Sequence, residues 1–281
     1  MNILIFGSEG NIGSSLVKNF LKKTKGNIYI VDVNKKSVHK NERIKYLSFN
    51  NKRFNKTIIS KPVDLVVIAS FIMNYQNYIN GKEKIYLNKS ERLIEKILDF
   101  CSKIKIKRLI YLSSIAVYGK TNYCTEKSRL KPATIYGLAK LNSENIIKKK
   151  ISIKSKYKYL ILRLTHIYGE NIKNNFVNFF LKNKNNLLIN GNGKQTRNLL
   201  HVDDLFSLIK KTKSLKINST INVASKENIS LNKIIKLIKG KAKYNNNFKD
   251  SYPDEVSYEK ARKLLSWSPR KKFIRYLKRY I

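Results

Sequence analysis

The chain has 281 residues, of which 59 are Lys or Arg and 18 are Asp or Glu, so its formal net charge is +41 at pH 7. A hydrophobic fraction of 42% supports a folded core and excludes global disorder. The apolar runs are far shorter than the ~20 residues of a membrane-spanning helix, so we expect no membrane insertion. The length fits about two domains or one large one.

The start of the chain and its cysteines indicate a cytoplasmic setting. Met1 leads directly into a predicted strand with no basic region or cleavage site before it, so we expect no signal peptide. Cys101 and Cys124 form no Cys-x-x-Cys pair, which argues against a disulfide framework and a structural zinc site. We expect no bound metal.

The positive charge has two interpretations. A strongly basic chain can bind nucleic acid. Here Lys outnumbers Arg and the basic residues are spread along the whole sequence, which favours a generally basic surface. We expect no specific nucleic-acid partner, although the field would attract an anionic small substrate.

The first half alternates short β-branched runs with amphipathic stretches. Strands are predicted at residues 2–6, 28–32, 45–49, 63–69, 108–113 and 159–164, and helices at 12–22, 87–102 and from about 136 to 150. This alternation predicts an α/β fold, a Rossmann-type doubly wound parallel sheet of six or seven strands with helices on both faces.

The second half is less regular. Helices are predicted at residues 174–182, 202–211, 231–238 and 258–265, with a short strand at 221–224. Residues 190–193 form a turn that could join the two strands of a hairpin. The Lys- and Asn-rich residues 239–249 are typical of a solvated loop.

A glycine-rich turn follows the first predicted strand and opens the first predicted helix. Its glycines are Gly7, Gly10 and Gly13, the spacing of a dinucleotide-binding fingerprint. They permit a tight turn, a close approach to a pyrophosphate and close helix–strand packing. The backbone N–H groups of Asn11 and Ile12 would face the anion.

Asp32 ends the second strand, 32 − 13 = 19 residues after the last of these glycines. A carboxylate there can accept hydrogen bonds from the adenine-ribose hydroxyls. It repels a 2′-phosphate and so favours NAD over NADP, although Lys35 and Lys36 moderate that preference. The alternative to a dinucleotide-binding turn is an ordinary glycine-rich turn. The position of Asp32 argues against this alternative.

Two further segments carry candidate chemistry. Tyr136 and Lys140 lie four residues apart on a predicted helix, so the phenol and the ammonium point the same way. A neighbouring ammonium and the positive ring of an oxidised nicotinamide favour the phenolate of a group whose free pKa is about 10. Ser113 and Ser114 end the fifth strand, at the edge where open α/β sheets bind ligands.

These segments together resemble the extended short-chain dehydrogenase/reductases, specifically the NAD-dependent epimerase/dehydratase family that acts on nucleotide sugars. The resemblance extends over nearly the whole chain. Besides the glycines and Asp32, it includes SSIAVYG (113–119), YGLAK (136–140) with Glu144, RLTHIYG (163–169), GNGKQTR (191–197) and HVDD (201–204).

The resemblance implies a role for each matching residue. Ser114, Tyr136 and Lys140 correspond to the catalytic triad, with Tyr136 as acid/base. The implied cofactor-binding residues are Gly7, Gly10, Asn11, Ile12, Gly13, Asp32, Ala69, Asn88, Ser113, Tyr136 and Lys140. The implied substrate-binding residues are Ser114, His166 and Arg197. Arg197 corresponds to the arginine that binds the substrate diphosphate, and His166, in place of the family's asparagine, would line the sugar or base pocket.

The sequence also departs from the family pattern. Ile115 and Ala116 occupy the positions of the Asp–Glu pair that dehydratases need, which disfavours a 4,6-dehydratase. Glu170 replaces a proline, and residues 252–255 contain no match to the second phosphate-binding arginine.

The function that the resemblance implies is NAD-dependent C4 epimerisation of a nucleotide-activated sugar through a transient 4-keto intermediate, by a cytoplasmic homodimer. An NAD-binding domain is expected at residues 1–165, with 200–225 returning to it, and a small α+β substrate region at 166–281. One alternative is an NAD(P)H-dependent 4-reductase of nucleotide-4-keto-6-deoxysugars. Another is a non-catalytic Rossmann protein that binds a dinucleotide or a polyanion.

Overall fold

A computed structural model describes residues 1–33, 39–47, 59, 61–71, 81, 83–151, 155–170, 172, 175–245 and 250–281. The chain divides into two compact units. The first unit comprises Met1–Ser113, Leu138–Leu162 and Lys216–Thr220, and the second comprises Ser114–Gly137, Arg163–Leu215 and Ile221–Ile281. The expected split into an NAD domain and a substrate region stays a prediction.

A seven-stranded sheet has the strand order β11-β7-β5-β4-β1-β2-β3. The bounds are β1 Ile3–Phe6, β2 Ile28–Val31, β3 Ile44–Tyr46, β4 Leu65–Ile68, β5 Arg108–Ser114, β7 Lys158–Leu164 and β11 Ser219–Val223. β1 pairs in parallel with β2 on one side and with β4 on the other. Since the chain winds outward from β1 in both directions, the predicted doubly wound α/β sheet is confirmed.

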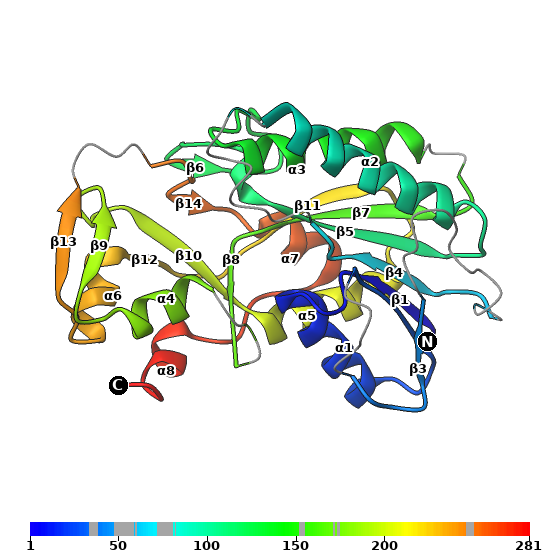
Figure 1. Ribbon diagram of the computed structural model, residues 1–281, viewed down its shortest axis with the longest axis horizontal. Helices are drawn as coiled ribbons and strands as arrows, with labels where there is room; N and C mark the ends of the chain where they lie inside the picture. The colour runs from blue at the N-terminus through cyan, green and yellow to red at the C-terminus, as the bar shows by residue number, and fades with distance from the viewer. Residues whose placement is uncertain are drawn as a thin grey trace. The chain divides into compact units, whose positions relative to one another are not determined.

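Helices cover both faces of this sheet within the first unit. Figure 1 shows α2 (Glu83–Cys101) and α3 (Ile135–Lys150) side by side on one face, and α1 (Asn11–Lys23) on the other. Every residue of β1, β2 and β4 is buried. Strands covered on both faces consist of consecutive apolar residues, which explains why these strands are recognisable in the sequence.

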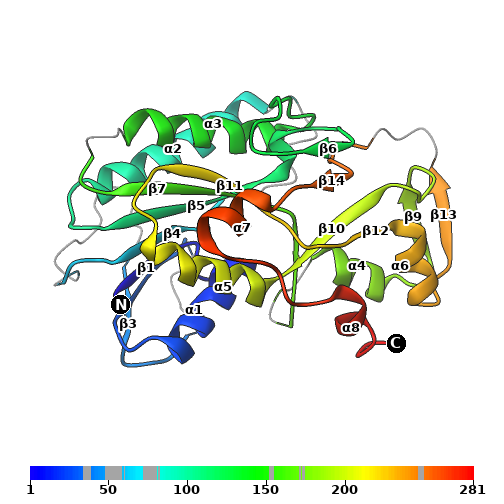
Figure 2. The same ribbon diagram turned by 180° about the vertical axis from the view of Figure 1, so that it is seen from behind.

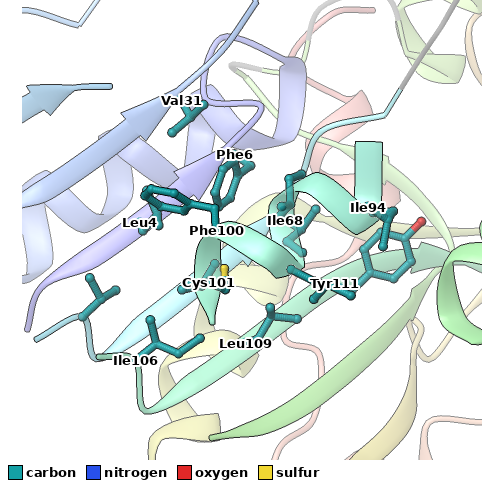
Figure 3. Close-up of a cluster of buried hydrophobic side chains, with 14 of the residues drawn as sticks. Leu4, Phe6, Val31, Ile68, Ile94, Phe100, Cys101, Ile106, Leu109 and Tyr111 are labelled. Atoms are coloured by element: carbon teal, nitrogen blue, oxygen red, sulfur yellow. The ribbon is translucent and has the colours of Figure 1, made fainter. Parts of the chain in front are cut away.

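The hydrophobic core under α2 fixes this layer. Figure 3 shows Phe100 of the helix next to Phe6 of the sheet, and Ile94 of the same helix next to Tyr111. The rings of Phe6 and Phe100 meet edge to face at a centroid distance of 6.2 Å. Complete burial raises the pKa of the Cys101 thiol, so this cysteine is a core residue.

The second unit holds smaller sheets. β8 (His166–Tyr168), β10 (Thr196–His201) and β12 (Asn228–Ser230) form one sheet, in the order β12-β10-β8. Two-stranded sheets pair β9 (Leu187–Asn190) with β13 (Ala242–Asn245), and β6 (Tyr123–Cys124) with β14 (Glu255–Val256). The helical segments are η3 Ile115–Val117, α4 Phe176–Lys182, α5 Val202–Lys211, η4 Thr212–Ser214, α6 Leu231–Leu237, α7 Glu259–Leu265 and α8 Phe273–Leu277.

A separate apolar core holds part of the second unit together. Figure 2 shows α4 and α6 beside the β9–β13 pair. Leu187 and Ile189 of β9 pack in one cluster with Ile234 and Ile235 of α6 and Phe180 of α4. Among the described residues, no helix is long and apolar enough to cross a membrane.

The predicted hairpin at residues 190–193 is wrong. β9 pairs with β13, whereas β10 pairs with β8 and β12. The backbone of the turn is bound elsewhere, because Gly193 accepts a hydrogen bond from the Asn232 N–H and Gln195 accepts one from the Leu231 N–H, both at the start of α6. The turn therefore anchors a helix rather than closing a two-stranded ladder.

The predicted loop at residues 239–249 is also partly wrong, because residues 242–245 form β13. Three of its four side chains are exposed, so the strand is as polar as a loop and only its pairing with β9 reveals it. Residues 246–249, the end of the strand predicted at 45–49 and the start of the helix predicted at 174–182 lie outside the described residues. The other predicted helices and strands are confirmed with small shifts of their ends.

Candidate active site

The turn between β1 and α1 has the geometry that its glycines predict. Gly7 has φ +80°, and a Cβ there would lie 2.5 Å from the Ser70 nitrogen. A Cβ on Gly13 would lie 1.9 Å from the Gly7 carbonyl oxygen. Only glycine permits this packing of the first helical turn onto the loop.

The N-terminus of α1 fits an anionic group. Gly10 is the N-cap residue and offers no side-chain acceptor, so the N–H groups of the first turn, at Asn11 and Ile12, have no side-chain cap. A 13-residue helix carries a partial positive charge at this end. Backbone donors and dipole together suit the pyrophosphate of a dinucleotide.

Asp32 is held against the same turn. Its Oδ2 accepts a hydrogen bond from the Glu9 N–H at 2.9 Å, and the Tyr46 hydroxyl donates to the Asp32 carbonyl oxygen at 3.2 Å. The carboxylate thus lies at the end of β2 beside the glycine loop, and its contact with a ribose stays a prediction. Lys35 and Lys36, which bear on the choice between NAD and NADP, lie outside the described residues.

Two other predicted cofactor residues come from the chain after the turn, and Ala69 lies against Gly7. Ala69 follows β4 directly, and its N–H donates to the Phe6 carbonyl at 2.9 Å, which places it at the end of the strand next to β1. Asn88 lies on α2 with an exposed side chain. Its predicted role beside the cofactor stays a prediction.

The two serines at the end of β5 make different contacts. The Ser113 hydroxyl donates to Glu144 Oε1 at 2.6 Å, and both side chains are buried. Ser114 Oγ accepts a hydrogen bond from the Ala116 N–H at 3.2 Å and caps η3. Because successive side chains of a strand alternate between its faces, only one of the two serines can face a given ligand.

Lys140 is anchored to the sheet from α3, one helical turn after Tyr136. Its Nζ donates to the Leu112 carbonyl of β5 at 2.8 Å and lies 4.2 Å from the centre of the Phe71 ring. The side chain is 4% exposed. Burial lowers the pKa of Lys140 to about 7, an effect that the nearby Glu144 carboxylate opposes.

Gly137 explains how the start of α3 reaches η3 within the second unit. A Cβ at this position would lie 2.5 Å from the Ala116 carbonyl oxygen. The Gly137 N–H also donates to Thr134 Oγ1 at 3.1 Å. Absence of a side chain at 137 therefore brings the helical turn with the half-buried Tyr136 against the segment that follows Ser114.

A buried polar network fixes the chain after η3. The Tyr118 hydroxyl accepts a hydrogen bond from Arg163 Nη1 at 2.8 Å and donates to Asn222 Oδ1 at 2.7 Å. The Asn222 N–H donates to Glu126 at 2.8 Å. Burial raises the pKa of Tyr118 to about 12, so this phenol remains a neutral structural group.

Arg197 lies on β10 and is paired. Its Nη1 and Nη2 donate to the two carboxylate oxygens of Asp250 at 2.9 and 2.8 Å, and Nη1 also donates to the Thr196 carbonyl at 2.7 Å. The guanidinium carbon lies 5.4 Å from the centre of the Tyr252 ring. The predicted diphosphate-binding group is thus bound to a carboxylate of its own chain.

His166 neighbours this pair. Its ring lies 4.9 Å from the Tyr252 ring and 5.6 Å from the Phe176 ring, centre to centre. Burial, with the Arg197 charge, lowers the pKa of His166 to about 3. Its Nδ1 is buried and has no hydrogen-bond partner among the residues that the structure describes. A neutral imidazole with an unused nitrogen suits contact with a ligand.

The sequence model of the NAD dependent epimerase/dehydratase family matches residues 3–224 of the chain. The chain belongs to this family. A Bacillus subtilis (strain 168) protein described as an uncharacterized UDP-glucose epimerase, YtcB, is 25% identical over 299 residues, which are 96% of this chain and 93% of that protein. The dTDP-D-glucose 4,6-dehydratase of Dictyostelium discoideum is 30% identical over 237 residues, 73% of this chain and 54% of its own length.

Solved structures agree with the fold of this epimerase/dehydratase family member. The UDP-glucuronic acid 4-epimerase of Bacillus cereus, in complex with UDP-glucuronic acid and NAD, superposes with a TM-score of 0.85 at 22% identity and covers 99% of this chain and 97% of its own. The NAD complex of dTDP-glucose 4,6-dehydratase from Bacillus anthracis str. Ames superposes with a TM-score of 0.78 at 20% identity. The match covers 100% of this chain and 95% of that one.

The departures from the family pattern have structural counterparts. Ile115 and Ala116 are buried in η3, where neither can transfer a proton. Glu170 forms an exposed ion pair with Arg279. Residues 252–255 contain no arginine, and the Tyr252 ring lies over Arg197 instead.

Two residues near the predicted site carried no assigned role in the sequence. Glu144 belongs to the segment that resembles the family, but the sequence indicated no partner for it; the structure shows that it accepts a hydrogen bond from Ser113. Asp250 lies 53 residues after Arg197 and outside every motif. Its pairing could be found only from the tertiary structure.

Proposed function

We propose that this protein interconverts the C4 epimers of a nucleotide-activated sugar with NAD as its cofactor. The matched family, the similarity to a protein described as a UDP-glucose epimerase, and the fold shared with a UDP-glucuronic acid 4-epimerase support this assignment. The buried hydrophobic residues Ile115 and Ala116 disfavour dehydration, because water elimination needs proton-transferring groups.

Residues of the first unit would hold the cofactor. The uncapped start of α1 with its glycine turn would bind the pyrophosphate, and Asp32 the adenine ribose. Bound NAD would supply a hydride acceptor and, in its reduced form, a hydride donor for the sugar carbon. Lys140 and Tyr136 would lie at the nicotinamide ribose.

The chain's own groups would move the proton and hold the substrate. Tyr136 removes the proton of the C4 hydroxyl and later returns it, while Ser114 hydrogen-bonds the same oxygen. General acid–base catalysis of this kind contributes roughly 10²–10⁴-fold. Arg197 binds the diphosphate through its planar fork, which leaves the sugar free to turn over.

The observation that carries the proposal is the placement of the Tyr-x-x-x-Lys turn of α3. Lys140 is tied to the Leu112 carbonyl near the carboxyl end of β5, and Gly137 lies against η3, which begins directly after Ser114. A surface pair at this spacing would be neither buried nor bonded to a strand.

The test is turnover of UDP-glucose and UDP-glucuronic acid with NAD present, followed by product analysis. We expect the C4 epimer without net change in nicotinamide absorbance, and loss of turnover in Tyr136→Phe with NAD affinity nearly unchanged. Stoichiometric consumption of NADH on adding a nucleotide 4-keto sugar would instead establish the 4-reductase. Unaltered turnover in Tyr136→Phe would reject the assigned acid/base.

We further propose a cytoplasmic homodimer that packs through α2 and α3. The two helices form one surface in the first unit, joined by Asn142–Glu91 and Lys150–Asp99 contacts at 2.6 and 3.0 Å. Ile85 is 49% exposed on α2. Sedimentation equilibrium should give twice the chain mass of 32.8 kDa, and the monomer mass would exclude the dimer.

A further inference from the structure

Four charged side chains of the second unit, one of them Arg197, form a cluster. Asp250 binds both Nη atoms of Arg197 at 2.8 and 2.9 Å and lies 3.6 Å from Lys120 Nζ. Lys120 also binds Asp254 at 2.5 Å. Two cations and two carboxylates balance, so the Arg197 cluster (Arg197, Asp250, Lys120 and Asp254) is neutral although the chain as a whole carries +41.

The Arg197–Asp250 pair is largely withdrawn from water, with side-chain exposures of 9% and 11%. Carboxylate and phosphate bind the guanidinium fork in the same bidentate way, so they compete for the same donors. A diphosphate that approached Arg197 with Asp250 still in place would meet a like charge in a medium of low dielectric. The two anions cannot share the fork.

We propose that Asp250 is a specificity-determining residue for the nucleotide sugar: its carboxylate occupies Arg197 in the free protein, and the ligand's diphosphate must take its place. The inference rests on the proposed function, since it takes Arg197 as the diphosphate-binding group. Asp250 thereby lowers the affinity for anions in general, so that productive binding needs the contacts of the nucleoside and sugar as well.

Lys120 provides the displaced carboxylate with a second cation. It lies within ion-pair distance of Asp250 already, at 3.6 Å, and its side chain is 41% exposed, so it can adjust at little energetic cost. If the Asp250 carboxylate moves from Arg197 to Lys120, it stays paired with a cation, and the Arg197 guanidinium becomes available to the phosphates. An unpaired buried carboxylate would otherwise oppose the exchange.

The experiment compares the wild type with Asp250→Asn and a matched variant, Asp254→Asn, in calorimetric titrations with UDP, inorganic pyrophosphate and uridine. Both variants remove one negative charge from the Arg197 cluster, but only Asp250 contacts Arg197. We expect Asp250→Asn to bind UDP and pyrophosphate about tenfold more tightly, Asp254→Asn to remain within about twofold of the wild type, and uridine to bind all three alike.

The inference is overturned if both variants gain equal affinity for the phosphate probes or if Asp250→Asn gains none. It is also overturned if neither UDP nor pyrophosphate binds to any of the proteins. Should Asp250→Asn fail to fold, a crystal structure of the wild type grown with UDP decides. The expected complex has phosphate oxygens on Arg197 and Asp250 moved towards Lys120, whereas Asp250 still bidentate on Arg197 contradicts it. Absence of epimerase turnover would reject the proposed function without changing these equilibrium measurements, so the two failures are distinguishable.

Discussion

Lys140 is an ionisable side chain in an apolar environment. It lies beside the rings of Phe71 and Tyr111, is bonded to the Leu112 carbonyl, and is compensated only in part by Glu144. Burial disfavours the ammonium, which is why the pKa of this side chain falls to about 7. An amine that titrates near neutrality can exchange its proton during turnover, which an exposed lysine with its higher pKa does poorly.

The lowered pKa of Lys140 predicts a specific dependence of stability on pH. Between about 7, its folded pKa, and about 10.4, the unfolded value, the unfolded chain binds a proton that the folded chain lacks. The free energy of unfolding therefore gains up to about 1.4 kcal/mol per pH unit from this group as the pH rises through that interval. In the Lys140→Met variant this pH-dependent rise in the free energy of unfolding should be absent. The measurement is denaturant unfolding at a series of pH values from 7 to 10.

The matched control for that measurement is Lys149→Met, on the same helix with an exposed side chain. In this variant the free energy of unfolding should rise with pH as steeply as in the wild type. A slope that is the same in Lys140→Met and in the wild type would mean that Lys140 stays protonated in the folded protein throughout this pH interval.

At the scale of elements, the site depends on close backbone approaches that glycines permit. Gly137 lets α3 meet η3, and Gly13 lets α1 meet the loop after β1. In each case the neighbouring atom is a backbone carbonyl oxygen, which cannot move as a side chain can. The two glycines therefore determine where each helix lies relative to the segment that it packs against.

Gly137→Ala should displace α3 from η3. Alanine normally stabilises a helix by about 0.5–1 kcal/mol relative to glycine, but here its Cβ would lie 2.5 Å from the Ala116 oxygen, and overpacking costs about 1–3 kcal/mol. We expect a net loss of stability and a lower kcat with KM less affected, measured by thermal unfolding and turnover. A more stable variant with the activity of the wild type would show that this contact does not position Tyr136.

Gly13→Ala should weaken cofactor binding. Its Cβ would lie 1.9 Å from the Gly7 oxygen, so the helix start would be pushed away from the loop, and NAD affinity should fall more than tenfold in calorimetric titration. Gly26→Ala is the control, since its Cβ would lie 2.2 Å from the Met1 oxygen. This change disturbs the first unit but not the glycine turn. Equal losses of NAD affinity in both variants would point to general destabilisation.

At the scale of the whole molecule, the charge of +41 acts on every anionic ligand. A field of this sign raises the encounter rate of a nucleotide sugar, and salt screens it with a Debye length of about 10 Å at ~0.1 M. We expect KM for the nucleotide sugar to rise between ~0.05 and ~0.5 M NaCl while kcat changes little. A KM that does not respond to salt would show that contacts inside the site alone determine affinity.

Much of the fold could be predicted because its signals are local. The strands β1, β2 and β4 are consecutive apolar residues, and the glycines of the first turn identify a βα junction before any contact is known. The same is true of Tyr136 and Lys140, whose common face follows from helical spacing. Wrong predictions arose where local composition resembled something else: β13 is polar and exposed, and residues 190–193 form a turn without a hairpin.

Local order along the chain was sufficient to identify the family, the doubly wound sheet and the candidate catalytic residues, since hydrophobic periodicity and motif spacing are properties of neighbouring residues. Contacts between distant residues were not accessible in this way. The Asp250 carboxylate on Arg197, the Glu144 carboxylate on Ser113 and the burial that lowers the pKa of Lys140 became visible only in three dimensions. Charge pairing and desolvation depend on which groups the folded chain brings together, and a sequence does not record those distances.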